Sequence, residues 1–570
     1  MIIRKCGSPA GLTSKSLAAA AAVLSTSLAF DACKPMPYEG QTTRDDSPNI
    51  LWLVMDHVTF HHYKETAGPL PTLDTYERLV REGIEFERAY SIQPICSPAR
   101  ASMLTGRYPI NHGVYTNATA QNDADVMRTA PFYHQYMRMR GYASAHFGKL
   151  HATIGAATER RNTDKGFDER SWGPVGYGEP YSSSEYRSYI ERNDWQTARY
   201  HLEWGILNSA RGTVFDMASV TNFNGPSHNG AYRALSSGYF TNPAGSRVHE
   251  SDFVVSLTMD YIDQCLAENR RFVVSVNPWG PHQPFQVPQD VKDTIYSNRA
   301  QIPEYPNYSG GAVNRPPYVR DYLNGRRGEM PGMNTWQDWQ PIMARAYEAY
   351  SYVDMALGRL LDYLDEKGLA ENTLVILTAD HGDELGSHGG LIDKAGNLSE
   401  EACRIPLVIR WPGRITPGTK TGALVSNIDI TATILEAGGL SVPPGMDSRS
   451  LIPVFRGDES RFNELILFHF GHSSGSGNHW YTQRAYYHGD YKYLASIADD
   501  GSFIHHELYN LKDDPFELIN LINDPLKQTD ALNMVRRLLS YMNKIGDNRD
   551  IKSTLQLRTE IQNKINELEG

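Results

Sequence analysis

Cysteine is scarce in this chain of 570 residues, which contains five. The five are Cys6, Cys33, Cys96, Cys265 and Cys403. Their wide separation matches neither the paired cysteines of a structural zinc site nor the dense spacing of a disulfide framework. The fold therefore depends on an ordinary hydrophobic core, and a special role for any cysteine has to be argued from its own surroundings.

An apolar run long enough to cross a membrane is also missing. The longest apolar segment, residues 16–30, follows three basic residues and precedes a polar stretch. This order predicts an export signal over residues 1–33 and a linker over 34–47, so we expect a periplasmic or secreted protein. An internal apolar helix is the alternative explanation. Cys33 leaves open a lipoprotein-type signal, whose product would be anchored to a membrane.

Basic residues are not in excess either. The chain has 55 Lys and Arg against 66 Asp and Glu, for a net charge of -11, and no long basic run. Nucleic acid is therefore not an expected partner. With 40% hydrophobic and 21% charged residues, the composition is that of a globular protein, and the length allows more than one domain.

What the chain does contain is a repeated arrangement in which a short apolar run ends in polar residues. The runs cover 50–55, 143–147, 272–276 and 373–378, and the segments 72–83, 254–268 and 344–367 have helical patterns. Buried strands that alternate with helices predict an α/β fold with a large, mixed, mostly parallel central sheet flanked by helices. Because such sheets bind ligands beyond the carboxyl ends of their strands, we expect the polar residues after these runs to meet at one site.

Composition suggests how the chain is divided. We expect an N-terminal domain over 48–457 that contains these runs, a smaller α+β subdomain with a short antiparallel sheet over 458–546, and a polar helix or tail over 547–570. Within the first domain, residues 160–250 and 290–340 are rich in Tyr, Trp, Asn, Gly and Pro. They are expected to be long irregular insertions that frame the pocket, with surface decoration as the alternative.

Cys96 begins a stretch that predicts a loop followed by a helix. Ser97 suits the N-cap, Pro98 suits the first helical position, and Gly106 suits the end of the helix. Cys96 would then face the free N–H groups and the positive dipole end of the helix, which favour an ionised or electron-rich nucleophile. From these residues alone, a capped helix beside a buried, inert cysteine is an equally good explanation.

The longer sequence motif that begins at Cys96 favours a reactive cysteine over an inert one. Cys-Ser-Pro-Ala-Arg from Cys96, followed by Leu-Thr-Gly-Arg from Leu104, resembles the signature of the type I sulfatases in the alkaline phosphatase superfamily. Residues 507–515, Glu-Leu-Tyr-Asn-Leu-Lys-Asp-Asp-Pro, are similar to a string in the C-terminal subdomain of that family. The resemblance covers residues 48–546 and implies a catalytic N-terminal domain with an alkaline phosphatase-like sheet. It also implies that a formylglycine-generating or anaerobic maturation enzyme converts Cys96 to formylglycine (3-oxoalanine), whose hydrate is the nucleophile.

The same resemblance implies a metal site. In the family, acids at two strand ends and the formylglycine oxygen hold one divalent ion, usually Ca²⁺. The expected ligands here are Asp56, Asp380, His381 and the modified Cys96, with Mg²⁺ or Mn²⁺ as alternative ions. His57 departs from the family, in which many members have a second acid at this position. It is expected to be a ligand, a hydrogen-bond donor in the site or a neighbour, and imidazole suits transition ions better than calcium.

Further residues match family positions that handle the sulfate group. Lys149 and Lys394 match the two lysines that bind it. His151 matches the histidine that assists the aldehyde hydrate, and His282 matches the one that contacts the sulfate or protonates the leaving oxygen. Arg100 would hold the hydrate and the metal-facing oxygens in place.

The function implied is hydrolysis of a sulfate monoester, carried by a small molecule or a glycan, to an alcohol and inorganic sulfate. Export favours a sulfated carbohydrate. One alternative is a phosphodiesterase or phosphonate monoester hydrolase with the same nucleophile, which the departure at His57 keeps open. Another is a non-catalytic binding protein on the same scaffold, in which Cys96 would remain an unmodified thiol.

Overall fold

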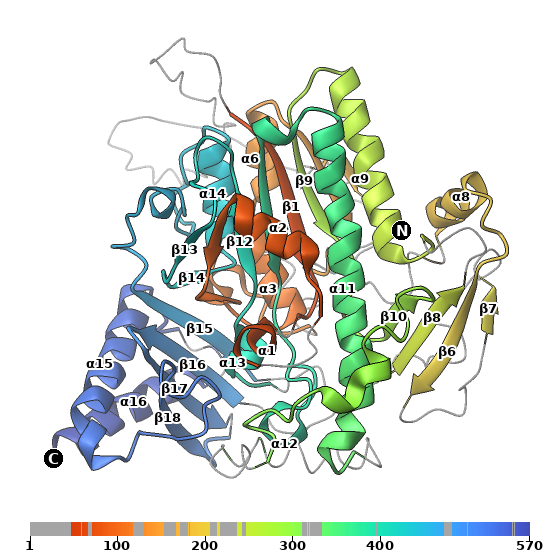
Figure 1. The fold of residues 1–570 in the computed structure, drawn as a ribbon. Coiled ribbons are helices and arrows are strands. Elements are labelled where there is room, and N and C mark those ends of the chain that lie inside the picture. The colour runs from red at the N-terminus through yellow and green to blue at the C-terminus, as the bar shows by residue number, and fades with distance from the viewer. Residues whose placement is uncertain are drawn as a thin grey trace, which may run out of the picture. The chain divides into compact units, whose positions relative to one another are not determined.

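A central sheet crosses the part of the chain that the computed structural model describes (Figure 1). The structure describes residues 47–570 except 59, 67–70, 118–129, 153–166, 171–180, 182, 206–213, 217–235, 242–246, 310–315, 317–318, 320–332, 395, 472–480, 499, 550 and 552. The predicted export signal and almost all of the predicted linker lie outside these residues. No helix within the described ranges combines the length and the apolar composition that a membrane span requires.

Four neighbouring parallel strands form the middle of the central sheet. They are β11 (Thr373–Ala379), β1 (Asn49–Met55), β9 (Phe272–Asn277) and β4 (Ala143–Gly148), in that order. Every residue of these strands is buried, which explains why the sequences of β1, β9 and β11 are mostly apolar, while β4 buries Ser144 and His146 among its apolar residues. The predicted parallel core is confirmed, and the carboxyl ends of all four strands lie at one edge.

Further described strands extend this sheet on both sides. They are β12 (Leu407–Arg410), β2 (Ile84–Phe86) and β13 (Thr419–Thr421) beyond β11, and β5 (Glu169–Arg170) beyond β4. Strand β12 runs antiparallel to both of its neighbours, so the sheet is mixed but mostly parallel, as predicted.

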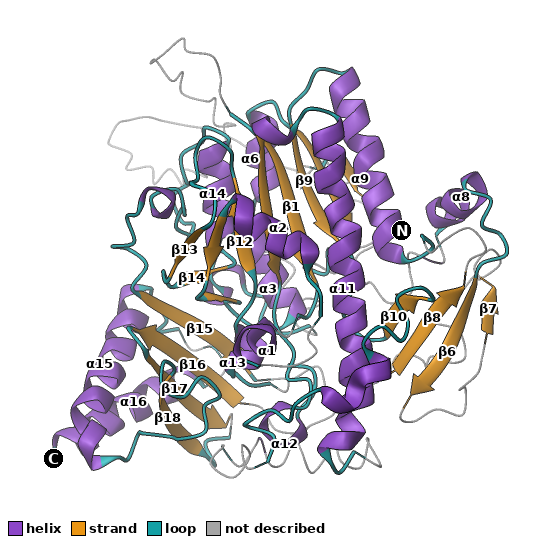
Figure 2. Cartoon of the chain, in the orientation of Figure 1, coloured by secondary structure: helices purple, strands orange, loops and turns teal. Residues whose placement is uncertain are grey.

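Helices cover both faces of the sheet (Figure 2). One set consists of α11 (Trp336–Glu366), packed against α2 (Asp74–Glu82) and α9 (Glu250–Ala267). The other consists of α14 (Asp429–Ala437), packed against α3 (Cys96–Thr105) and α6 (Tyr133–Met139). The three predicted helices are therefore present, although α11 begins eight residues before the predicted start at residue 344 and includes Pro341.

The prediction of irregular insertions is wrong for part of the first segment, residues 160–250, where three strands are described. A four-stranded side sheet is built from β10 (Phe285–Pro288), β8 (Ser236–Thr241), β6 (Arg199–Gly205) and β7 (Val214–Asp216), in that order. Tyr200, Leu202 and Phe240 point into the core from these strands, and aromatic residues favour strands. The aromatic content of this region therefore reflects a sheet rather than loops.

The C-terminal part forms an antiparallel sheet covered by two helices. Its described strands are β15 (Glu464–Phe470), β16 (Tyr481–His488), β17 (Tyr491–Ala498) and β18 (Ile504–Asn510), each paired with the next. Helices α15 (Gln528–Lys544) and α16 (Thr554–Glu569) pack against this sheet and each other. Leu557 and Ile561 of α16 are fully buried, so residues after 547 contribute to this core.

Candidate active site

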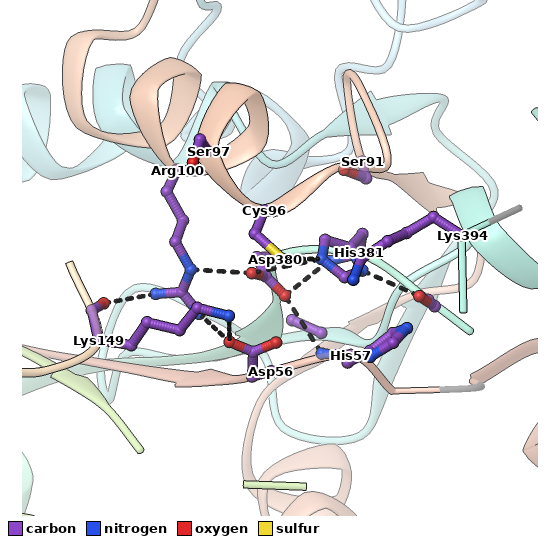
Figure 3. Close-up of polar contacts among 12 residues, drawn as sticks. Asp56, His57, Ser91, Cys96, Ser97, Arg100, Lys149, Asp380, His381 and Lys394 are labelled. Atoms are coloured by element: carbon purple, nitrogen blue, oxygen red, sulfur yellow. Dashed lines mark hydrogen bonds and ion pairs between the residues drawn. The ribbon is translucent and has the colours of Figure 1, made fainter. Parts of the chain in front are cut away.

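The polar residues that follow the central strands do converge. Asp56 follows β1, Asp380 follows β11, Lys149 follows β4, and Asn277 is the last residue of β9. Arg100 of α3 reaches all four of these positions through its guanidinium group. The residues that the sequence is expected to bring together at the carboxyl edge do lie side by side (Figure 3).

The start of helix α3 differs in detail from the prediction. The helix begins at Cys96 itself, after an extended Ile95, so Ser97 is not the N-cap and Pro98 is the third helical residue. The backbone N–H of Ser97 instead donates to Oδ1 of Asn117, 3.0 Å away, and this distant side chain replaces the predicted local cap. Gly106 ends the helix as predicted, with φ of 65° and its N–H bonded to the carbonyl of Ser102.

Arg100 lies between the two strand-end carboxylates (Figure 3). Its Nε donates to Oδ2 of Asp380 at 2.8 Å, and one terminal nitrogen donates to Oδ2 of Asp56 at 2.9 Å. The other terminal nitrogen donates to the carbonyl of Lys149 at 2.7 Å. All these groups are buried, and the guanidinium reduces the repulsion that two buried carboxylates would otherwise have.

Cys96 lies beside His381 at the same edge. Its Sγ is 3.1 Å from Nε2 of His381, while Nδ1 of that ring is 2.9 Å from the carbonyl of Gly382. A carbonyl accepts only, so Nδ1 carries the proton and Nε2 is left to face Cys96. Burial opposes ionisation of Cys96, but Lys149 and Lys394 hold the pKa of its thiol well below the usual value. Burial opposes protonation of His381, but Asp380 and Cys96 raise its pKa.

This cluster has the donors that a divalent cation requires. One ligand atom from each of Asp56, Cys96, Asp380 and His381 lies within 4.8 Å of all the others. Oδ1 of Asp56 is buried and finds no hydrogen-bond partner among the described residues, which is costly unless a cation uses it. Two carboxylates suit a hard ion such as calcium, and so would the oxygen that residue 96 would carry after the conversion that the sequence resemblance implies. These residues fit the metal that the sequence resemblance implies.

His57 lies outside that four-residue group. Its backbone has φ of 68°, and its N–H donates to Oδ1 of Asp380 at 3.2 Å. Its side chain turns toward another loop, with Nε2 3.2 Å from Oδ1 of Asp393 and 3.4 Å from Oδ2 of Asp383. Together with Asp56 and His282 it forms a separate buried group of candidate ligands. Burial, with the nearby Lys394, keeps the pKa of His57 well below the usual value, so its ring is neutral.

The predicted cationic residues surround the same centre. Nζ of Lys149 is 2.5 Å from Oδ2 of Asp56 and 4.1 Å from the ring centre of Trp279, and Nζ of Lys394 is 2.5 Å from Oδ1 of Asp393. Both lysines are buried and both lower the pKa of the Cys96 thiol.

The two predicted catalytic histidines also lie at this centre. Both His151 and His282 interact with Cys96, and burial lowers the pKa of each ring. Nδ1 of His282 is 2.8 Å from the carbonyl of Gln283, which places its proton on Nδ1. All the sequence-predicted site residues are thus near one another, with His57 the one whose ring turns toward a different loop.

Three further residues at this site are not among those expected from the sequence. Asn277 accepts from Arg100 at 3.2 Å, Trp279 lies under Lys149, and Asp393 pairs with His57 and Lys394. Asn277 and Trp279 could have been identified from their position, because they lie between the apolar run 272–276 and His282. Asp393 had no such signal, since its role depends on a loop conformation.

A buried carboxyl anchors the turn that carries His282. Oε1 of Glu250, at the start of α9, accepts the N–H of Gly280 at 2.9 Å, and the carbonyl of Gly280 accepts the N–H of Asp56. Burial raises the pKa of Glu250 from 4.5 to about 7. Because the folded state holds this proton more tightly, Glu250 favours folding fully below about pH 4.5, and this contribution is lost as the pH rises through 7.

We therefore expect Glu250→Gln to gain stability relative to wild type as the pH rises. The difference in free energy of unfolding, measured by urea denaturation from pH 4.5 to 8, should change in favour of the variant by about 3 kcal/mol at most. Asp354→Asn is a matched control. Asp354 is buried, its pKa is also raised to about 7, and it accepts the N–H groups of Thr75 and Tyr76 in α2. Both variants should show the pH effect, because each replaces a carboxyl of raised pKa by an amide whose oxygen still accepts the same N–H groups. A pH-independent difference from wild type in the Glu250→Gln variant would contradict titration of Glu250 near pH 7.

The fold and the site together define a class of protein. A mostly parallel sheet presents two acids, a cysteine at a helix start, two buried lysines and several histidines at one edge, which is the arrangement of a hydrolase site. The sequence model of the Sulfatase family matches residues 48–440, more than half of the chain, and the chain belongs to this family. A second model, described as N-sulphoglucosamine sulphohydrolase, C-terminal, matches residues 386–544. The protein is a sulfatase-type hydrolase.

Curated relatives match along most of the chain. A choline-sulfatase of Rhizobium meliloti is 26% identical over 494 residues, covering 84% of this chain and 83% of the relative. An N-acetylglucosamine-6-O-sulfatase of Bacteroides thetaiotaomicron is 26% identical over 525 residues, covering 85% and 84%.

Solved structures share the fold. One, determined in complex with its substrate D-glucosamine-2-N,6-O-disulfate, has a TM-score of 0.65 at 19% identity and covers 89% of this chain and 99% of its own. A phosphonate monoester hydrolase of Silicibacter pomeroyi also has a TM-score of 0.65 at 19% identity, covering 89% and 96%.

Proposed function

We propose that this protein hydrolyses sulfate monoesters of carbohydrates, with residue 96 as the nucleophile after its conversion to formylglycine. The observation that carries the proposal is the buried cluster of Asp56, Cys96, Asp380 and His381, surrounded by two lysines and two histidines. The names of two similar proteins, which mention N-acetylglucosamine-6-O-sulfatase and D-glucosamine-2-N,6-O-disulfate, support a sulfated sugar as substrate. The predicted export signal supports a substrate met outside the cell.

The proposed chemistry divides among residues of this chain. The hydrate of formylglycine would supply a hydroxyl nucleophile. A divalent cation held by Asp56, Asp380 and His381 would lower the pKa of that hydroxyl and attract the sulfate oxygens. Lys149 and Lys394, buried on either side of residue 96, bind the sulfate oxygens on which charge develops. Arg100 holds Asp56 and Asp380 in fixed orientations.

Proton transfer is assigned to the two histidines. Once its ring is protonated at both nitrogens, His282 donates the Nε2 proton to the leaving oxygen, and His151 accepts a proton from residue 96. Burial keeps the pKa of both rings low in the protein alone. The negative charge of a bound sulfate ester raises the pKa of His282, so His282 becomes an acid when substrate is present.

The test compares the hydrolysis of a sulfate ester and a phosphate diester that share the same leaving group. With purified, matured enzyme, kcat/KM for an aryl sulfate should exceed that for the matching phosphate diester by about two orders of magnitude, equivalent to ~3 kcal/mol in transition-state binding. A panel of sulfated glycans should then include better substrates than the aryl ester. Activity confined to choline or aryl sulfates would overturn the carbohydrate assignment.

Phosphonate monoester hydrolysis is the second candidate. His57 supports it, because this neutral ring replaces the second acid common in sulfatases and changes the charge near the substrate. Two phosphonate monoester hydrolases, one of Silicibacter pomeroyi and one of Agrobacterium radiobacter, also share the fold. A higher kcat/KM for a phosphonate monoester than for the sulfate with the same leaving group would establish this alternative.

A further inference from the structure

Trp279 contacts two of the residues that handle the sulfate group in the proposed function. Its ring centre is 4.1 Å from Nζ of Lys149 and 4.7 Å from the ring centre of His282, whose plane is inclined to it by 43°. The Trp279 side chain is buried. One indole therefore meets both the ammonium proposed to bind the sulfate and the imidazole proposed to protonate the leaving oxygen.

The backbone fixes where Trp279 stands relative to His282. The N–H of His282 donates to the carbonyl of Trp279 at 3.3 Å, which closes a turn between the two residues. Inside this turn, the N–H of Gly280 donates to Glu250 at 2.9 Å, and the carbonyl of Gly280 accepts the N–H of Asp56 at 3.3 Å. The turn that carries both side chains is thus held on two sides.

Lys149 needs such a contact because its ammonium is buried on a long, flexible side chain. Its ion-pair partner, Oδ2 of Asp56, also accepts from Arg100, and Asp56 is a proposed metal ligand. The face of an indole attracts an ammonium through the ring quadrupole and takes up none of its N–H groups in conventional hydrogen bonds. Lys149 can therefore keep its contact with Trp279 while its N–H groups bind sulfate oxygens.

The His282 ring is held by contacts of a different kind. Its Nδ1 is 2.8 Å from the carbonyl of Gln283, and its ring also meets His57, with 4.5 Å between ring centres. The bond at Nδ1 leaves Nε2 as the nitrogen available to a leaving oxygen. Packing against Trp279 limits rotation of the ring, so the direction of Nε2 depends on this indole.

We propose that Trp279 is a positioning residue that holds Lys149 through the face of its ring and His282 through packing, so that both reach the sulfate ester together. The inference rests on the proposed function, because it assumes that these two residues act on a sulfate group. Trp279 acts through them, and its ring does not take part in the bond changes. The contact with Lys149 should affect sulfate binding, and the contact with His282 should affect protonation of the leaving oxygen.

The contact with Lys149 is tested by replacing the indole of Trp279 with indoles that carry one to four fluorine atoms, introduced by nonsense suppression. Fluorine weakens the attraction of the ring for a cation and changes its shape little. In matured enzyme, kcat/KM for a sulfate ester should fall steadily with each fluorine, by about 10-fold in total. Trp52 of β1 is the matched control, because it is also buried and its ring contacts Tyr133. Equal effects at positions 279 and 52 would overturn the proposal.

The contact with His282 is tested by the leaving group. Trp279→Leu should lower kcat/KM by about 10-fold for a sulfate of an acidic phenol and by about 100-fold for an alkyl sulfate, whose leaving oxygen requires a proton. Trp279→Phe keeps an aromatic face and should restore most of both activities. A purely structural defect would lower both activities by the same factor, and that result would overturn the role of Trp279 in holding His282.

Binding of inorganic sulfate, measured by calorimetry, provides a readout that does not use activity. Wild type and Trp279→Phe should bind sulfate with similar affinity, and Trp279→Leu should bind it about 10-fold more weakly. Equal affinity in all three proteins would overturn the role of Trp279 in holding Lys149. The two proposals fail in different ways. Wild type that cleaves no sulfate ester would overturn the proposed function, and the three sulfate affinities would still decide the role of Trp279.

Discussion

Replacing Cys96 by alanine is expected to lower kcat by about 10⁴-fold or more, the scale on which nucleophile removal acts in hydrolases. Alanine cannot be converted to formylglycine, so the site would lose its nucleophile and keep its lysines, histidines and carboxylates. The change is small in volume, at the first residue of α3, and the helix retains its end at Gly106. We therefore expect the free energy of unfolding to change by about 1 kcal/mol.

Cys265→Ala is the matched control for this prediction. Cys265 is also a buried free cysteine, but it lies in α9 and away from the cluster. The control should keep wild-type kcat. Peptide mass analysis of wild type should find residue 96 with an aldehyde in place of the thiol, and residue 265 unmodified. Full activity in Cys96→Ala would eliminate residue 96 as the nucleophile, and an intact thiol in active enzyme would eliminate formylglycine.

Asp380→Asn should have the second largest effect. It removes one of the two carboxylates that Arg100 joins and one donor of the proposed metal cluster. We expect kcat/KM to fall by about 10³-fold, equivalent to ~4 kcal/mol, together with much weaker binding of calcium. Loss of the charge that faces buried Arg100 should also lower the free energy of unfolding by about 3 kcal/mol. Activity, metal content and thermal unfolding measure these three effects separately.

Asp547→Asn is the control that separates the effect of Asp380→Asn on the free energy of unfolding from its effect on calcium binding. Asp547 pairs with buried Arg484 at 2.7 and 3.0 Å in the C-terminal part of the chain. Its substitution should lower stability by a similar amount while calcium binding and kcat/KM stay near wild type. If Asp380→Asn retained calcium affinity and lost only stability, Asp380 would be a structural partner of Arg100 and not a metal ligand.

The parallel core could be predicted because its strands are buried on both faces. Mostly apolar runs of five or six residues leave few alternatives, and the polar residues that follow them have to lie at one edge of the sheet. Asp56 and Asp380 were identified in this way. The Cys96 string and the family resemblance then supplied the lysines and histidines that periodicity alone would have left as surface or core residues.

Individual contacts between residues far apart in the sequence could not be predicted. Arg100 donates a hydrogen bond to Asp380, 280 residues away, and His62 forms an ion pair with Glu401, which lies in another short helix. Neither pair has a periodic pattern or fixed spacing. The N-cap prediction for α3 was wrong for the same reason. The side chain of Asn117, which is distant in sequence, supplies the hydrogen-bond acceptor that the local sequence assigns to Ser97. The side sheet was missed because aromatic strands separated by Gly-rich and Asn-rich segments resemble loops in composition.

A crystal structure of the matured protein grown with calcium would test the proposed metal site most directly. We expect one calcium ion bonded to oxygens of Asp56 and Asp380 at about 2.3–2.6 Å, with residue 96 present as formylglycine and its oxygen on the same ion. A structure in which Arg100 alone lies between the two carboxylates, with calcium bound elsewhere and residue 96 still a thiol, would contradict it.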